Sequence, residues 1–113
     1  MNEKQINDLI AVKVMGWNLE QRDYSTAWVD EEGQWFLKQL WKPCTDIRDA
    51  FVVIEKLRKE NDFWFELTTP ESWSLKYRCY FQLDEMEVHA VEETAPLAIC
   101  KAALKAFEVE VVE

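Results

Sequence analysis

The stretch Thr94-Ala-Pro-Leu-Ala-Ile-Cys-Lys-Ala-Ala-Leu-Lys-Ala-Phe107 says more about the fold of this chain than any other segment. Thr94 is a residue type that caps helices, and Pro96 stands in the first turn, where no amide hydrogen bond is lost. The Ala/Leu/Lys run that follows favours helix. We therefore predict a helix from about Ala95 to Phe107. Its apolar residues lie on more than one side, which is typical of a helix packed on a broad sheet or covered by a partner.

A first helix is predicted upstream, from about Glu3 to Met15. Asn2 and Gln5 stand three residues apart, as in a capping box. Gly16 stands where a left-handed residue is expected to end the helix.

A second helix is predicted to begin after a cap at Thr45 or Asp46 and to run to about Glu60. Its apolar residues recur at i, i+3, i+4, i+7 and i+10, which is the clearest amphipathic pattern in the chain. These residues are Ile47, Ala50, Phe51, Ile54 and Leu57.

Five strands are predicted in the remaining segments, and the last two form a hairpin. The strands are Ala27–Val29, Gln34–Gln39, Phe63–Thr68, Ser74–Leu83 and Met86–Val91. If Asp84-Glu85 is a two-residue loop, Phe81 faces Val88 on the apolar side and Tyr80 faces His89 on the polar side. On one face of the hairpin, apolar residues then pair with apolar residues, and on the other face polar residues pair with polar residues. This pairing supports the register.

The element order αββαβββα predicts one α/β domain over residues 1–113. We expect a three-layer α/β/α sandwich around a five-stranded, mainly antiparallel sheet, because hairpin connections join neighbouring strands. Phe63-Trp-Phe-Glu-Leu67 is apolar on both faces, which predicts a central strand covered on each side. The end, Glu108-Val-Glu-Val-Val-Glu113, alternates and is interpreted as either a frayed tail or an added edge strand.

Three stretches of the chain resemble the phage ABA sandwich domain family. They are Val14-Met-Gly-Trp17, Thr45-Asp-Ile-x-x-Ala50-x-x-Val53-Ile-Glu-Lys-Leu57 and Thr94 to Ala106, so the resemblance covers both ends and the middle helix. The family comprises small proteins of bacteriophages and prophages and is named for a three-layer α/β/α arrangement. The resemblance implies this fold and a phage setting, and it implies no activity and no catalytic residues.

The charge balance makes a nucleic-acid partner unlikely. The chain has 22 acidic and 13 basic residues and a formal net charge of −9, whereas phosphate backbones attract stripes of Lys and Arg. Lys76, Arg78 and Tyr80 share one strand face that could stack and neutralise a nucleic-acid strand. Glu87 and Glu93 stand opposite in the predicted register, so cross-strand ion pairs explain these residues without a ligand. The acidic clusters suggest an alternative, a protein that mimics DNA.

The three cysteines predict free thiols in a reducing compartment. Cys44, Cys79 and Cys100 are odd in number and form no C-x-x-C pair. Cys79 and Cys100 fall on apolar stripes and are expected in the core. Cys44 precedes a helix, but no sequence pattern supplies a base or an oxyanion site, so we interpret it as a bystander thiol. The chain has no signal-peptide pattern and no apolar run of membrane-spanning length, which predicts the cytoplasm of a bacterial host and no membrane contact.

No metal, cofactor or catalytic site is predicted. His89 is the single histidine, and Glu85, Glu87 and His89 share one face of a strand. Alternate strand residues are about 6.5–7 Å apart, so these three side chains converge poorly on one metal ion and fit a solvated polar face. The chain has two glycines, too few for a phosphate-binding loop or a dinucleotide fingerprint.

These observations predict a non-catalytic phage or prophage accessory protein that acts by protein–protein contact. Its partner would be a host or phage protein, and the chain would be a monomer or a homodimer. The alternative is an acidic, DNA-mimicking inhibitor of a host nucleic-acid enzyme. The predicted interaction surface comprises Trp41 and Trp73, both expected to be partly exposed, together with Arg78, Tyr80 and His89.

Overall fold

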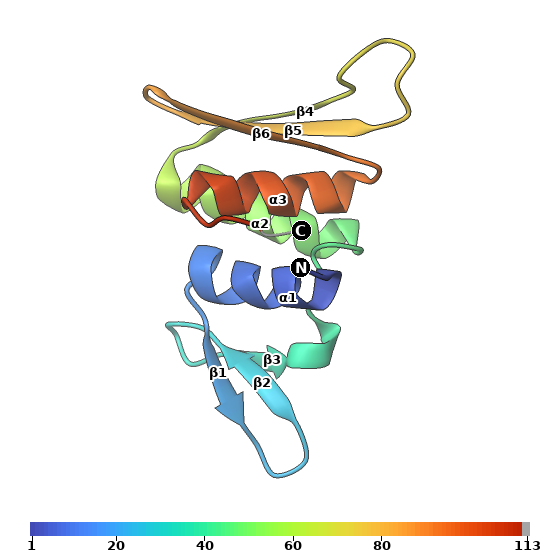
Figure 1. The fold of residues 1–113 in the computed structure, drawn as a ribbon. Helices are drawn as coiled ribbons and strands as arrows, with labels where there is room; N and C mark the ends of the chain where they lie inside the picture. Colours follow the sequence, from blue (N-terminus) through green and yellow to red (C-terminus); the bar gives the residue numbers. More distant parts are fainter. Residues whose placement is uncertain (112–113) are drawn as a thin grey trace.

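The computed structural model describes residues 1–111 and arranges them in layers, with the helices in the middle and a sheet on each outer side (Figure 1). Along the chain, a helix is followed by three strands, a second helix, three more strands and a third helix. One connected hydrophobic core joins the helices to both sheets. None of the helices within residues 1–111 is long and apolar enough to cross a membrane.

The first helix has the predicted start and an unexpected second half. α1 (Glu3–Leu9) continues as a π-helical turn, η1 (Ile10–Val14). The capping box is confirmed, since Asn2 Oδ1 accepts the Gln5 N–H at 2.9 Å and Gln5 Oε1 accepts the Asn2 N–H at 2.8 Å. Gly16 follows η1 with φ +74°, the left-handed conformation that glycine adopts without a steric penalty.

The other two helices lie where the sequence predicts them. α2 (Ile47–Asn61) is capped by Asp46, whose carboxylate accepts the Arg48 N–H at 2.9 Å. α3 (Ala95–Ala106) is capped by Thr94, whose hydroxyl accepts the Leu97 N–H at 3.4 Å. Local capping chemistry therefore fixes where both helices begin.

The larger sheet contains β4 (Trp64–Thr68), β5 (Tyr77–Leu83) and β6 (Met86–Glu92), all antiparallel and in that order. The predicted hairpin register is confirmed, because Phe81 pairs with Val88 and Tyr80 pairs with His89. α3 packs under β5 and β6, and α2 contacts β4.

The smaller sheet lies on the other side of the helices and contains β1 (Asn18–Gln21), β2 (Thr26–Val29) and β3 (Trp35–Leu37). A 3-10 turn, η2 (Lys38–Leu40), follows it. β1 was not predicted, because all four of its residues are exposed and they carry no apolar alternation. Trp28 on β2 is buried and connects this sheet to the core.

The expected single five-stranded sheet and the α/β/α layer order are wrong. Residues 1–111 form two three-stranded antiparallel sheets with the helices between them. The physical reason lies in α3, which is buried on most of its circumference and therefore needs cover on more than one side. Its buried residues are Ala98, Ile99, Cys100, Ala102, Ala103, Leu104 and Ala106. The large sheet covers one side of α3, and α1, η1 and α2 cover others.

The prediction of a central, doubly covered strand at Phe63–Leu67 is also wrong. β4 pairs with β5 alone and is an edge strand of the large sheet. Phe65 and Leu67 pack against the core, whereas Trp64 on the other face is 63% exposed.

Residues 108–111 do not form the added edge strand that is one of the two interpretations of the C-terminal segment. Residues 108–111 are irregular, and the rest of this prediction, at 112–113, lies outside the described residues. The Val109 N–H donates to the Leu104 carbonyl at 2.8 Å, and the Val109 side chain packs on the core.

Candidate functional site

The side of the large sheet that faces away from the helices is covered by no other helix or strand of residues 1–111 (Figure 1). Cys79, Phe81 and Ala90 point toward α3 and are buried, so their neighbours along each strand point the other way. We call this surface the outer face. Its members are Trp64, Glu66, Thr68, Arg78, Tyr80, Gln82, Glu87, His89 and Val91.

The outer face brings together three of the residues that the sequence predicts for an interaction surface. Tyr80 on β5 stands at the centre, with Glu66 of β4 on one side and His89 of β6 on the other. Arg78 is two residues away on the same strand face. The predicted grouping of Arg78, Tyr80 and His89 on one face is therefore present.

A hydrogen bond ties the centre of the outer face together. The Tyr80 hydroxyl donates to Glu87 Oε1 at 2.8 Å and lies 3.1 Å from Gln82 Oε1. The hydrogen bond to Glu87 is the main cause that raises the pKa of Tyr80 above its ordinary value of 10.0. Tyr80 therefore remains a neutral hydroxyl at physiological pH.

Of the two basic residues near Tyr80, Lys76 forms the cross-strand ion pair that the register predicts. Lys76 and Glu93 form a cross-strand ion pair at 3.6 Å, and both side chains are exposed. Arg78 is half-buried, and its Nε atom is shielded from solvent without an acceptor among residues 1–111. A basic track that could follow a phosphate backbone is not formed here, because Glu66, Glu87 and Glu93 alternate with these cations.

The acidic residues around His89 do not come together as a ligand set. Glu85 lies in the turn before β6, and Glu87 accepts the hydrogen bond from Tyr80. Within residues 1–111, no group of three or more His, Cys, Asp or Glu side chains is arranged to hold a metal ion.

Two exposed tryptophans border the outer face. Trp73 is 77% exposed, as predicted, and lies in the segment 69–76 between β4 and β5. Figure 1 shows this segment rising from the sheet on the side away from the helices. Trp64 is a member of the outer face that the sequence analysis missed, because its apolar neighbours suggested cover on both sides. Its alternation with Phe65, Glu66 and Leu67 is the signal that places it opposite the core residues.

The expected exposure of Trp41 is wrong. Trp41 is only 7% exposed and forms an aromatic cluster with Trp17, at 4.6 Å between ring centroids, and with Phe36, at 6.4 Å. The 3-10 turn η2 directs the chain inward here, since the Trp41 N–H donates to the Lys38 carbonyl at 3.1 Å. Trp41 therefore lies far from the outer face, on the side of the small sheet, and has a structural role.

All three cysteines are free and buried. Burial raises the pKa of the Cys79 thiol to about 12, and it raises the pKa of Cys100 as well. The prediction that these two are core residues is confirmed. The backbone N–H of Cys44 donates to Asn7 Oδ1 at 3.0 Å, which anchors the segment before α2 to α1.

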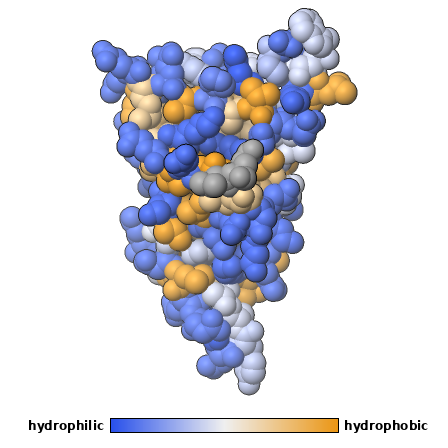
Figure 2. Space-filling view, in the orientation of Figure 1, coloured by the Kyte–Doolittle hydropathy of each residue, from blue (hydrophilic) through white to orange (hydrophobic). Residues whose placement is uncertain are grey.

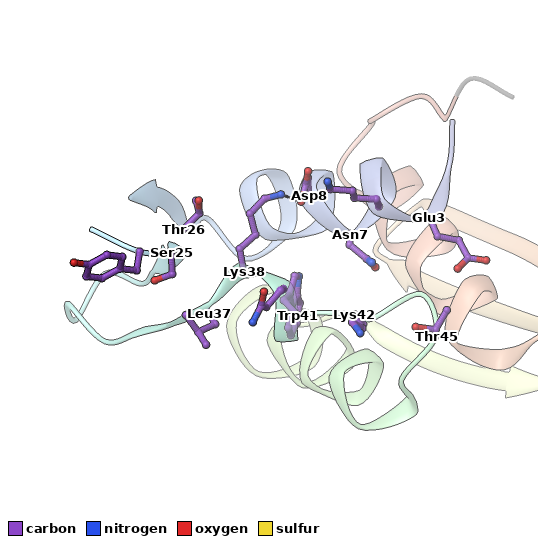
Figure 3. Close-up of a pocket in the computed structure, with 13 residues that line it drawn as sticks. Glu3, Asn7, Asp8, Ser25, Thr26, Leu37, Lys38, Trp41, Lys42 and Thr45 are labelled. Carbon is purple, nitrogen blue, oxygen red and sulfur yellow. Dashed lines mark ion pairs between the residues drawn. The ribbon is translucent and has the colours of Figure 1, made fainter. Parts of the chain in front are cut away.

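A hollow of about 870 Å³ lies between α1, the turn before β2 and the segment from Leu37 to Thr45 (Figure 3). Figure 3 shows Lys38 reaching across it to Asp8, with which it forms an ion pair at 3.3 Å. Trp41 stands between Lys38 and Lys42 in this view. Among the described residues that line the hollow, none is a histidine or a cysteine, and Lys38 is already paired with Asp8. Its geometry supports no specific chemistry.

The remaining surface seen in Figure 2 is mainly hydrophilic. Hydrophobic groups on this face are separated by polar side chains, and they do not merge into one large patch. Interaction sites on such a surface depend on a few large side chains with polar surroundings.

Comparison with known proteins places the chain among phage proteins. The sequence profile of the phage ABA sandwich domain matches residues 8–104. A phage protein from Bacillus cereus ATCC 14579, solved by crystallography at 2.0 Å, is similar to this chain with a TM-score of 0.74 and 27% sequence identity. That similarity covers 99% of this chain and 93% of the other. No curated protein matches. The chain belongs to the phage ABA sandwich domain family.

Proposed function

We propose that this phage domain is a non-catalytic accessory protein that contacts a host or phage protein through the outer face and the neighbouring segment 69–76. The observation that carries the proposal is the exposure of two tryptophans, Trp64 at 63% on the uncovered face of the large sheet and Trp73 at 77% in the adjoining segment 69–76. A tryptophan left in water keeps a large apolar surface that a partner can bury, and tryptophans are frequent energetic centres of interfaces.

The surroundings of these tryptophans resemble the rim of a protein interface. On the same sheet face as Trp64 lie Glu66, Tyr80, Glu87 and His89, which supply hydrogen-bond donors and acceptors to orient a partner. Leu75 and Tyr77, close to Trp73 in the chain, are exposed as well. A large apolar side chain within a polar surface is the arrangement that protein partners recognise.

A DNA mimic is the weaker explanation of the same surface. Such a protein needs a continuous track of negative charge spaced like phosphates. On the outer face, Arg78 and His89 interrupt the acidic residues, and several carboxylates elsewhere serve turns and caps. Asp30 accepts the Glu32 and Gln34 N–H groups, for example, and Asp46 caps α2.

The cytoplasm of the bacterial host is the compartment that we propose for this contact. The three cysteines are unpaired and buried, and free thiols of this kind persist in reducing surroundings.

The test captures the partner with tagged protein from lysate of infected host cells and compares two variants. Trp64→Ala/Trp73→Ala is expected to weaken capture about tenfold or more, because truncating an interface tryptophan removes much of the binding energy. The yield of each captured protein is measured by quantitative mass spectrometry.

Trp35→Ala is the matched control, since Trp35 is also exposed, at 52%, but lies on the small sheet. This variant should capture the partner as well as the wild type does. Equal capture by the double variant and the wild type would contradict the proposal, as would selective loss in the Trp35 variant.

A further inference from the structure

The two edge strands of the large sheet differ in how far their backbone groups are covered and hydrogen-bonded. At the β6 edge, Lys105 Nζ donates to the His89 carbonyl at 2.8 Å, and residues 109–111 line a hollow together with residues 90–92. At the β4 edge, neither Phe65 nor Leu67 has a backbone hydrogen bond to any segment of residues 1–111 outside the sheet. Exposed edge backbone is a template for another strand, and proteins normally protect it.

The hydrogen-bonding pattern identifies the backbone groups at this free edge. The His89 carbonyl is reached by Lys105 and therefore points away from β5. Backbone groups of an antiparallel pair alternate in direction, so the groups of Tyr80, opposite His89, point toward β4. Glu66, opposite Tyr80, then bonds to β5, and Phe65 and Leu67 direct their N–H and C=O groups outward.

Two exposed apolar residues of α2 lie on a helix face that looks toward this edge. Arg58 of α2 lines a hollow together with Trp64 and Phe65, and the hollow is also lined by the charged residues Lys59 and Asp62. The face of the helix that carries Arg58 therefore looks toward β4. Ile47 and Phe51 share that face, because they precede Arg58 by eleven and seven residues. Phe51 is 45% exposed and Ile47 41%, which is unusual for a face directed at the core side of a sheet. An added strand beside β4 would cover them.

We propose that the free edge of β4 accepts an extended segment of the partner protein as a fourth strand of the large sheet. The segment carries apolar side chains toward Phe65, Leu67 and Phe51, and a lysine or arginine opposite Glu66 on the outer face. Main-chain hydrogen bonds then provide affinity, and the alternate side chains provide specificity. This inference rests on the proposed protein-binding function and states how the partner is held.

The negative charge of the chain favours a positively charged segment beside β4. Glu66 is exposed in the middle of β4, and the whole chain carries a formal net charge of −9. A second copy of the chain fits less well. When two β4 strands pair antiparallel with Phe65 opposite Leu67, the two Glu66 side chains stand directly opposite each other, and like charges in that position are destabilising.

The probe is the blocked peptide acetyl-Lys-Thr-Val-Lys-Val-Thr-Lys-amide, whose central lysine is placed opposite Glu66 and whose valines face Phe65 and Leu67. It is titrated into ¹⁵N-labelled protein, and amide shifts and hydrogen exchange are followed by NMR. We expect the amides of Phe65 and Leu67 to shift and to exchange more slowly, while Tyr80 is little affected.

Two matched peptides test the strand geometry. N-methylation of either valine removes an N–H that faces β4 and should weaken binding about tenfold, whereas N-methylation of the central lysine, whose N–H faces away, should change it less than about threefold. The variant Glu66→Lys should weaken the original peptide about tenfold and should prefer a peptide with glutamate at the centre.

The inference is overturned if no binding occurs at about 2 mM peptide, a level at which even millimolar affinity is detectable, or if all three N-methylated peptides bind equally. Protection of Phe65 and Leu67 that depends on protein concentration without peptide would overturn it in favour of a homodimer. If the peptide does not bind but partner capture still depends on Trp64 and Trp73, the proposed function stands. Only the inference that the partner adds a strand to β4 is then contradicted.

Discussion

Replacing Phe81 with alanine is expected to lower the free energy of unfolding by about 3–5 kcal/mol. Phe81 lies on the inner face of the central strand β5 and is fully buried. Its ring centroid is 5.6 Å from that of Phe65 and 6.1 Å from that of Phe63. The truncation leaves a cavity between the large sheet and α3 that these rings cannot fill without moving the backbone.

Urea denaturation, monitored by circular dichroism, measures this loss in the free energy of unfolding. With a slope of about 1.5 kcal/mol per M, the midpoint should fall by about 2–3 M. Phe51→Ala is the control, since it deletes the same atoms from a half-exposed position on α2. A loss as large for Phe51 as for Phe81 would contradict the assignment of the inner face.

Trp28→Ala is the second change with a large expected effect, again about 3–5 kcal/mol. Trp28 is buried on β2, and its side chain joins the same hydrophobic core as α3 and the inner face of the large sheet. The small sheet should therefore unfold together with the rest of the molecule, and the variant should lose stability in one transition that fluorescence and circular dichroism report alike.

The control is Trp35→Ala, on the neighbouring strand β3, where the indole stacks on Arg22 at 4.8 Å and is half-exposed. This change should cost much less than Trp28→Ala. If Trp28→Ala instead melts the small sheet in a separate, earlier transition, the two sheets do not share one cooperative core.

Local elements of this fold are readable from the sequence because their signals are local. The caps Asn2, Asp46 and Thr94 act within three residues of their own positions, so each helix start follows from a few side chains. The hairpin register follows from the alternation of β5 and β6 around a two-residue turn, since a shift by one residue would turn every core side chain outward.

The layer order was not readable, because it depends on which surfaces meet over long distances. The apolar residues on several sides of α3 indicated cover on more than one side, and they did not say whether sheet, helix or partner supplies it. The polar segment Asn18–Gln21 forms β1 without any apolar alternation, since its pairing with β2 alone determines it.

The candidate surface was predicted in part. The alternation of β5 and β6 placed Arg78, Tyr80 and His89 on one polar face, and the position of Trp73 at the start of a predicted strand indicated partial exposure. Trp41 was misjudged because its partners, Trp17 and Phe36, come from distant segments. Trp64 was misjudged because a strand with apolar residues on both faces is read as central, whereas here it stands at an edge.

Hydrogen exchange of the chain bound to its captured partner, read by mass spectrometry, tests the central claim most directly. The account predicts slower exchange in β4 and in the segment 69–76 upon binding, with β1, β2 and β3 unchanged. Protection confined to the small sheet, with β4 exchanging as it does in the free protein, would contradict it.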